Sequence, residues 1–279
     1  MAGAALHAVG LVTHPNRDDA SRLADELEKR LRSGGLDVRR WHEGGDLEQF
    51  VDGLDLAVSL GGDGTMLRTV DLVYESGAAV LGVNVGHLGY LTEVEPDQLA
   101  VAADRIIAGD FTVTERMVLQ VVVESKGTAG GRWWALNETV LEKENPGRII
   151  RVAVDINGTF FTSYAADGLI VATPTGSTAY SFSARGPIVS PRHRCLLLTP
   201  VSPHMLFDRS LVLDADEELS FTVLEPQRCA LTIDGLAIGE LDCGDRVSCT
   251  GGPRPARVVT FGPRDFHQIL KAKFGLADR

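Results

Sequence analysis

The spacing of apolar residues changes near residue 110, and this change constrains the fold more than any other feature of the sequence. From residue 8 to about 109, short apolar runs alternate with stretches of helical periodicity. The apolar runs lie at 8–13, 36–41, 54–60 and 78–83. Strands that alternate with helices predict a doubly wound, Rossmann-like α/β domain with a parallel sheet.

After residue 110, short β-rich runs follow one another without room for helices. Asn157-Gly158 and Asp234-Gly235 each lie between two such runs. Both dipeptides favour type I′ turns, because the two central residues of such a turn need positive φ. The second half is therefore predicted to be an antiparallel β-sandwich. A helical pattern returns at 265–274. The expected division is an α/β domain at 1–112, a β-sandwich at 113–258, and a C-terminal segment at 259–279 that packs back on the α/β domain.

Composition and charge exclude several classes of partner. The net charge of −11 disfavours non-specific binding to nucleic acid or to an anionic membrane, so any phosphate site must be local. No stretch approaches the roughly 18 consecutive apolar residues of a membrane span. The N-terminus lacks the basic region of a signal peptide, and the four cysteines form no CxxC pair. We expect a cytoplasmic protein with free thiols.

The apolar run at 54–60 continues into Gly61-Gly62-Asp63-Gly64 and then into a helical pattern. A glycine loop between strand and helix exposes backbone N–H groups to phosphate, and the helix N-terminus adds a favourable dipole. A carboxylate in such a loop repels phosphate, so Asp63 is expected to serve a hydroxyl or a metal. The alternative is a tight turn in which Asp63 or Thr65 caps the helix.

Two further stretches carry polar residues beside apolar strands. Residues 173–178 are dense in hydroxyls and are followed by Tyr180, which could stack on a base or ring. The alternative is a solvated loop. Asn137-Glu138 interrupts an otherwise apolar run, either as a satisfied edge pair or as a ligand contact. Walker A, GxSxG and HExxH motifs are absent, and no His/Cys cluster has the spacing of metal ligands.

Taken together, four motifs resemble the NAD kinase family. They are GGDGT at 61–65, NVGHLGYLTE at 84–93, LNE at 136–138, and DG followed by TPTGSTAY at 167–180. The resemblance extends from about residue 8 to residue 262. It implies a kinase that transfers the terminal phosphoryl group of ATP or polyphosphate to the adenosine 2′-hydroxyl of NAD, with a divalent metal such as Mg²⁺. It also implies a homodimer or homotetramer.

The resemblance further implies which residues form the site. Asp63 matches the general base of the family. Residues expected to contact nucleotide or phosphate are Gly61, Gly62, Gly64, Arg68, Asn137, Glu138, Arg148, Asp167, Thr178, Ala179, Tyr180 and Ser183. We expect no side chain of this protein to be a metal ligand.

Two departures from the family pattern concern substrate choice and affinity. Many members carry a basic residue where this sequence has Ala165, and many carry glycine where it has Arg185. These departures motivate a rival hypothesis, a catalytically weak protein that binds NAD or NADP as a sensor. A second rival is a lipid kinase that shares only the GGDGT loop.

Overall fold

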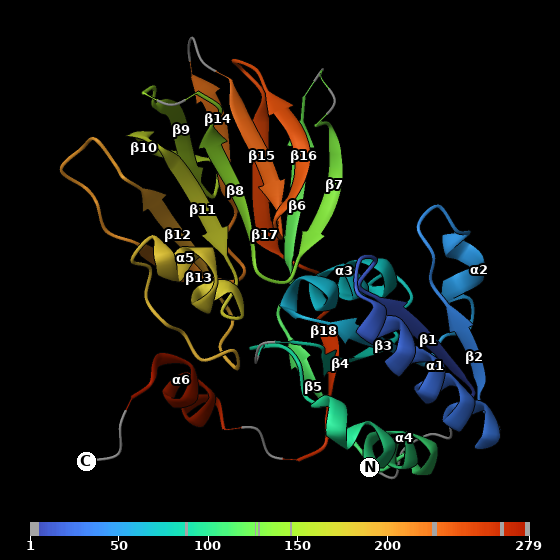
Figure 1. Cartoon of the computed structure of the whole chain (residues 1–279). Coiled ribbons are helices and arrows are strands. Elements are labelled where there is room, and N and C mark those ends of the chain that lie inside the picture. The colour runs from blue at the N-terminus through green and yellow to red at the C-terminus, as the bar shows by residue number, and fades with distance from the viewer. Residues whose placement is uncertain are drawn as a thin grey trace. The chain divides into compact units, whose positions relative to one another are not determined.

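Contacts divide the chain into two units, Met1–Glu115 with Ala256–Arg279, and Arg116–Pro255 (Figure 1). We call them unit 1 and unit 2. The structure is a computed structural model, and it describes residues 6–86, 89–125, 127, 129–145, 147–224, 228–262 and 265–276. Within that part of the chain, no helix combines the length and the apolar character needed to cross a membrane.

Unit 1 is built on a six-stranded sheet with the order β2-β1-β3-β4-β18-β5. The strands are β1 (Ala8–Thr13), β2 (Asp37–Arg40), β3 (Leu56–Gly61), β4 (Ala79–Asn84), β5 (Thr112–Arg116) and β18 (Ala256–Thr260). The helices are α1 (Asp18–Ser33), α2 (Leu47–Val51), α3 (Asp63–Val73), α4 (Leu99–Ala108) and α6 (Phe266–Phe274), with a short 3-10 helix, η1 (Pro96–Gln98). From β2 to β18 the paired strands run parallel. The predicted α/β fold is confirmed.

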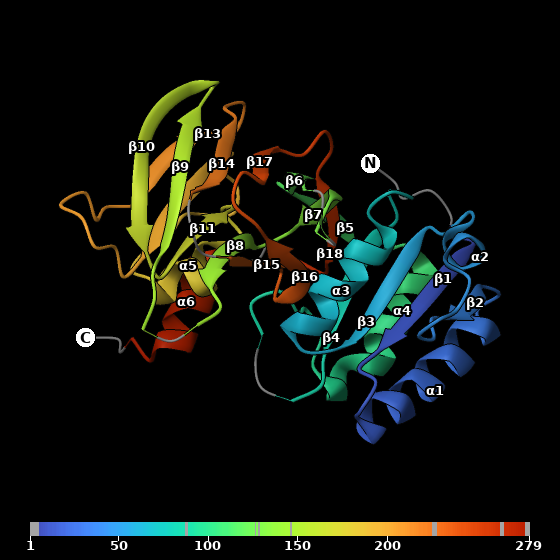
Figure 2. The same ribbon diagram turned by 90° about the horizontal axis from the view of Figure 1, so that it is seen from above.

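Helical periodicity explains how the sheet of unit 1 is covered. On α1, the buried residues Ala20, Ala24, Leu27 and Leu31 recur on one face. They join the residues of α4 in a core against one side of the sheet, while α3 packs on the other side (Figure 2). Helices on both faces explain why β3 is buried along its whole length.

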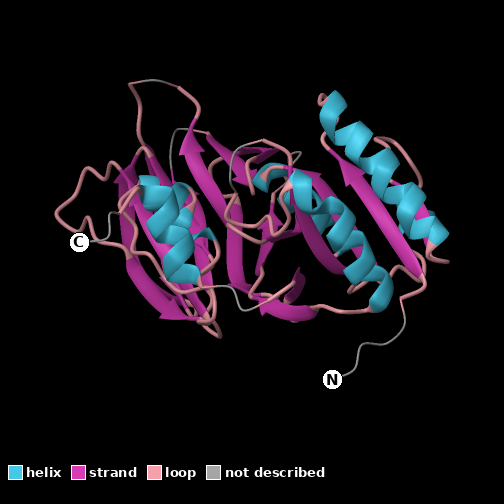
Figure 3. Ribbon diagram, turned by 60° about the horizontal axis from the view of Figure 1, so that its bottom comes forward, coloured by secondary structure: helices cyan, strands magenta, loops and turns pink. Residues whose placement is uncertain are grey.

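Unit 2 consists of two six-stranded sheets, and strands make up most of it (Figure 3). The first sheet contains β10 (Thr159–Ala166), β9 (Ile150–Ile156), β14 (Leu219–Leu224), β17 (Arg246–Gly251), β6 (Leu119–Glu124) and β7 (Gly131–Ala135). The second contains β13 (Leu211–Asp214), β12 (Cys195–Val201), β11 (Gly168–Ala172), β8 (Glu138–Lys143), β15 (Cys229–Ile233) and β16 (Leu236–Leu241). One apolar core joins residues from both sheets, and the pairs described are antiparallel, which confirms the predicted sandwich.

The two predicted hairpin turns have the expected backbone. Asn157 and Gly158 have φ of 52° and 75°, and Asp234 and Gly235 have φ of 48° and 80°. These positive values match a type I′ turn between twisted antiparallel strands. Short helical segments occur where the hydroxyl-rich stretch lies, as η2 (Gly176–Thr178) and α5 (Tyr180–Ser183).

The C-terminal part of the chain completes the sheet of unit 1. Strand β18 lies between β4 and β5, so the chain returns to this sheet at residue 256. The Thr112 hydroxyl of β5 donates a hydrogen bond to the carbonyl of Thr260 in β18, at 3.2 Å. The sheet of unit 1 is thus made from segments at both ends of the chain.

Candidate functional site

The carboxylate of Asp63 is held by backbone amides of a distant loop. Helix α3 begins at Asp63, and its N-cap is Gly62, so Asp63 does not cap the helix with its side chain. Its carboxylate instead accepts hydrogen bonds from the N–H groups of Tyr90 at 2.8 Å and Leu91 at 2.9 Å. Bonds from N–H groups to a charged oxygen are among the strong ones. The side chain therefore has a fixed orientation before any ligand binds.

Close packing requires glycine at two positions around this carboxylate. A Cβ at Gly89 would lie 2.3 Å from Oδ1 of Asp63, and a Cβ at Gly61 would lie 2.1 Å from Oγ1 of Thr65. At Gly62 and Gly64, by contrast, an added Cβ would meet no described atom within 4 Å. Those two glycines leave the backbone of the loop open, as a phosphate-binding loop requires. His87 and Leu88 of the NVGHLGYLTE motif lie outside the described residues.

The two arginines predicted to contact the dinucleotide occur in different units. Arg68 of α3 is 38% exposed, and its guanidinium forms an ion pair with Glu43 at 2.8 Å. Arg148 lies in the exposed turn before β9, in unit 2. The ion pair with Glu43 was not expected, because the sequence does not show that residue 43 lies beside α3.

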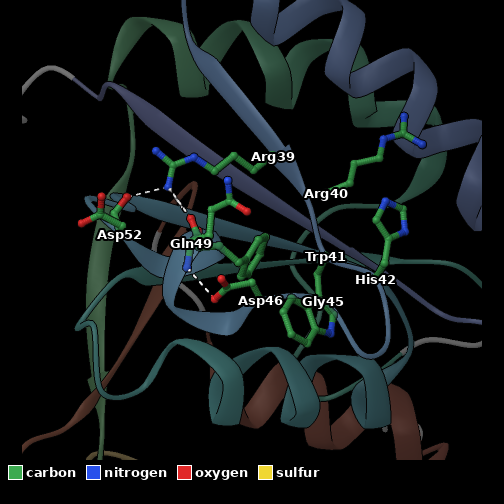
Figure 4. Close-up of a pocket in the computed structure, with 9 residues that line it drawn as sticks. Arg39, Arg40, Trp41, His42, Gly45, Asp46, Gln49 and Asp52 are labelled. Carbon is green, nitrogen blue, oxygen red and sulfur yellow. Dashed lines mark hydrogen bonds between the residues drawn. The ribbon is translucent and has the colours of Figure 1, made fainter.

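A cavity of about 480 Å³ lies beside β2 and α2, and none of the predicted site residues lines it (Figure 4). Its cationic side chains already have partners. Arg39 donates to the carbonyl of Gln49 at 3.2 Å, and Arg40 pairs with Asp25 at 2.7 Å and Glu28 at 2.6 Å. The arginines of this cavity are therefore not available to an anion.

In unit 2, the structure brings Asn137 and Glu138 beside the hydroxyl-rich stretch. The N–H of Thr173 donates to the carbonyl of Asn137 at 2.8 Å, and its hydroxyl donates to the carbonyl of Leu136 at 2.6 Å. A Cβ at Gly176 would lie 2.2 Å from the carbonyl oxygen of Asn137, so glycine is required there. Two segments that are separate in the sequence are therefore in direct contact.

Glu138 is a buried acid whose pKa lies well above its ordinary value. Glu138 is only 7% exposed, and its Oε2 atom has no hydrogen-bond partner among the described residues. Burial, first, and the neighbouring charge of Asp234 together raise the pKa of Glu138 to about 8, against a hydrogen bond from the backbone N–H of Tyr180 that lowers it. The carboxyl group can therefore donate a hydrogen bond as well as accept one.

The stretch from Thr173 to Thr178 is not the solvated loop that was the alternative. Residues 173 to 177 are buried, and the hydroxyl of Ser177 donates to the carbonyl of Pro174 at 2.7 Å. The hydroxyl of Thr178 donates to the carbonyl of Thr175 at 3.4 Å. Tyr180 is 37% exposed. Ala179 precedes it and Ser183 ends α5, exposed to solvent.

Asp167 carries a partner that the sequence analysis missed. Its carboxylate accepts from Nζ of Lys143 at 2.6 Å, and the two side chains are 29% and 28% exposed. The register of β8 against β11 places Lys143 there, and that pairing could not be read from the sequence. A cation thus approaches Asp167 from the neighbouring strand, whereas Ala165 supplies none.

Arg185 occupies a left-handed backbone position with φ of 66°. Its N–H donates to the carbonyl of Phe182 at 2.9 Å directly after α5, and the residue is exposed. Only glycine adopts such a φ without steric cost. This geometry explains why glycine suits the position, and the backbone accommodates arginine at the cost of local strain.

Comparisons with known proteins agree with these motifs. The ATP-NAD kinase N-terminal domain family matches residues 39–111, and the ATP-NAD kinase C-terminal domain family matches residues 136–261. A protein named NAD kinase from Heliobacterium modesticaldum is 42% identical over 275 residues, which cover 95% of this chain and 97% of that protein. A second NAD kinase, from Syntrophotalea carbinolica, is 36% identical over 97% of this chain and 99% of its own.

Solved structures resemble the chain over nearly its whole length. Yeast NADH kinase complexed with NADH has a TM-score of 0.89 and 24% identity, and the match covers 99% of this chain and 89% of that one. This likeness shows the fold alone. An NAD kinase from Archaeoglobus fulgidus in complex with ATP has a TM-score of 0.74 and 26% identity, over 96% of this chain and 97% of that one.

Gly89→Ala tests the close approach to Asp63. The added methyl must displace either the Asp63 carboxylate or the loop, so we expect the free energy of unfolding to fall by about 1–3 kcal/mol. Urea denaturation measures this loss. Gly262→Ala is the matched control, because its methyl would meet no described atom within 4 Å. Equal stabilities of the two variants would contradict the packing described.

Glu138→Gln tests the buried proton. A pKa raised on folding stabilises the folded state fully below the unfolded pKa, and that contribution is lost as pH rises through the folded value of about 8. Between pH 5 and pH 8.5, the wild type should therefore lose stability, on the order of a few kcal/mol, that the glutamine variant does not lose. Denaturation at both pH values measures the difference. Parallel pH dependences in the two proteins would exclude a raised pKa.

Arg185→Gly tests the strained backbone after α5. We expect the variant to be more stable by up to about 1 kcal/mol, since glycine adopts positive φ freely. Thermal denaturation measures the gain. Arg192→Gly is the control, because Arg192 is exposed and is not among the residues with positive φ. A loss of stability in both variants would show that residue 185 is not strained.

Proposed function

The chain belongs to the ATP-NAD kinase family, and we propose that Asp63 is the general base with which it phosphorylates NAD to NADP. The family matches cover residues 39–111 and 136–261, well over half of the chain. The activity is that of a phosphotransferase whose acceptor is an alcohol, the adenosine 2′-hydroxyl of NAD.

The observation that carries the assignment of Asp63 is its anchored carboxylate. Hydrogen bonds from the backbone N–H groups of Tyr90 and Leu91 orient both carboxylate oxygens. Each oxygen keeps a further lone pair that can accept a proton. As the 2′-hydroxyl oxygen bonds to the terminal phosphorus of ATP, Asp63 takes the hydroxyl proton and the bond to the bridging oxygen of ADP breaks. A positioned base contributes roughly 10²–10⁴-fold to the rate.

The loop beside Asp63 is proposed to hold phosphate. The open backbone at Gly62 and Gly64 and the N-terminus of the eleven-residue helix α3 present N–H groups to an anion. Glycine at position 61 leaves room for the side chain of Thr65, which an added Cβ would clash with. Arg68 would reach phosphate only by leaving Glu43, and Arg148 is the exposed basic candidate of unit 2.

The NAD contacts are proposed to come from unit 2. Asn137 and Glu138 would bind ribose and base edges, and Asp167 would contact the nicotinamide side. Thr178, Ala179, Tyr180 and Ser183 would line the ring pockets, with the exposed part of the Tyr180 ring as the stacking surface. The buried contacts between Thr173 and the carbonyls of Leu136 and Asn137 support this grouping.

A divalent ion such as Mg²⁺ would be bound chiefly through the phosphates of ATP. Among the described residues, no group of three or more His, Cys, Asp or Glu side chains is placed to hold a metal. Asp63 lies within the glycine loop, between Gly62 and Gly64, and its carboxylate oxygens already accept two hydrogen bonds from backbone N–H groups. The ion would neutralise phosphate charge during transfer.

Cytoplasmic location and self-association are proposed on separate observations. All four cysteines are free thiols, and three of them are buried, as expected in a reducing compartment. On β10, at the edge of its sheet, Phe160 and Phe161 are exposed, which suits a dimer or tetramer. The sensor and lipid-kinase hypotheses gain no support from the comparisons.

Asp63→Asn tests the role of the base. The amide keeps the size of the side chain but cannot accept the hydroxyl proton, so we expect kcat to fall by about 10²–10⁴-fold with little change in NAD affinity. Formation of NADP from NAD is followed with ATP and, separately, with polyphosphate as donor.

The control for this experiment is Asp97→Asn, an exposed aspartate of η1 in the same unit. Its turnover should equal that of the wild type. Wild-type turnover in Asp63→Asn would show that the base has been assigned wrongly. A wild type that binds NADP but forms none from any donor would instead favour the sensor.

A further inference from the structure

The turn between β15 and β16 contains a strained residue with an unusual set of contacts. Asp234 has φ of 48°, a left-handed conformation that aspartate tolerates better than most residues. In a hairpin turn of this type, asparagine or glycine would serve equally well. The turn alone therefore does not explain the carboxylate.

The carboxylate of Asp234 accepts hydrogen bonds from three consecutive backbone N–H groups. Oδ2 accepts from Leu136 at 2.7 Å, and Oδ1 accepts from Asn137 at 2.8 Å and Glu138 at 3.0 Å. The N–H of Asp234 in turn donates to the carbonyl of Glu138 at 2.9 Å. Successive N–H groups that converge on one anion fix the backbone conformation of all three residues.

Residues 136–138 are held from the opposite side by Thr173. The hydroxyl of Thr173 donates a hydrogen bond to the carbonyl of Leu136, and the N–H of Thr173 donates to the carbonyl of Asn137. Asp234 therefore binds the N–H groups of the segment, while Thr173 binds its carbonyls. The backbone polar groups of Leu136 and Asn137 are thus satisfied within the protein, so they do not need the side chains of Asn137 and Glu138 as partners.

We propose that Asp234 is a positioning residue for the dinucleotide, whose carboxylate fixes residues 136–138 so that Asn137 and Glu138 meet NAD in one orientation. This inference rests on the proposed function, in which Asn137 and Glu138 bind NAD. Asp234 itself does not touch the reacting atoms.

The negative charge of Asp234 has a second effect, on the proton of Glu138. The titratable groups that face Glu138 are Asp234, from the β15–β16 turn, and the phenol of Tyr180, from α5. Asp234 helps to raise the pKa of Glu138 to about 8. Without that charge, Glu138 should lose its proton at a lower pH.

Asp234→Asn separates positioning from folding. Asn-Gly suits the turn as well as Asp-Gly does, but the amide has one oxygen in place of two and carries no charge. We expect the KM for NAD to rise about tenfold, the KM for ATP to stay within about twofold, and kcat to fall less than the KM rises. The inflection in the pH profile of the KM for NAD should move to lower pH.

A second pair of variants distinguishes orientation from charge. In a Glu138→Gln background no carboxyl proton remains, so Asp234→Asn should still raise the KM for NAD but should shift no pH inflection. Asp234→Gly keeps the positive φ without strain and removes the side chain, so it serves if the asparagine variant does not fold. Circular dichroism monitors folding in each case.

Asp245→Asn is the matched control. Asp245 lies in the next turn of the same unit, where its carboxylate accepts from the N–H of Asp242 at 2.9 Å and from the hydroxyl of Ser125 at 2.6 Å. This substitution also removes a charge from a turn, but the hydrogen bonds of Asp245 go to Ser125 and Asp242 and not to residues 136–138. It should leave the KM for NAD unchanged.

Calorimetric titration with NAD separates this inference from the proposed function. A folded Asp234→Asn variant with wild-type KM, wild-type Kd and an unmoved pH inflection overturns the inference. A wild type that binds NAD without phosphorylating it overturns the function alone, and the ratio of the two Kd values then tests Asp234. A wild type that neither binds nor phosphorylates NAD overturns both.

Discussion

Each unit contains a carboxylate that is held by consecutive backbone N–H groups of a distant segment. In unit 1, Asp63 accepts from Tyr90 and Leu91; in unit 2, Asp234 accepts from residues 136 to 138. Each set of hydrogen bonds joins the aspartate to a segment at least 27 residues away along the chain. Because each set pairs a charged acceptor with fixed N–H groups, both segments are oriented before substrate arrives.

This arrangement restricts which residues can stand beside the carboxylates and carbonyls. Gly89 must lack a side chain because Asp63 occupies the space, and Gly176 must lack one because the carbonyl of Asn137 does. The open positions, Gly62 and Gly64, lie on the loop that is proposed to receive phosphate. Glycines in the motifs therefore serve two purposes, close packing at some positions and ligand access at others.

Local patterns in the sequence predicted the fold class of both units and the main strands and helices of unit 1. Apolar periodicity identified the strands and helices of unit 1, and the Asn-Gly and Asp-Gly pairs identified two hairpins, because these signals depend on neighbouring residues. The ion pairs of Arg68 with Glu43 and Lys143 with Asp167 could not be predicted. They depend on strand register and on how loops pack, which no local pattern records. The contacts of Asp234 also depend on how distant segments pack. In the sequence, the Asp234-Gly235 pair indicated only a turn.

The distribution of charge explains how so acidic a chain can bind polyanions. Its net charge is −11, and three arginines of unit 1, Arg39, Arg40 and Arg68, already contact carbonyls or carboxylates. In the proposed function, phosphate recognition relies mainly on the N–H groups at Gly62, Gly64 and the start of α3. N–H groups attract an anion through fixed dipoles without a mobile countercharge, so they select by position. An acidic surface combined with a local amide site disfavours non-specific binding of nucleic acid while leaving room for a nucleotide phosphate.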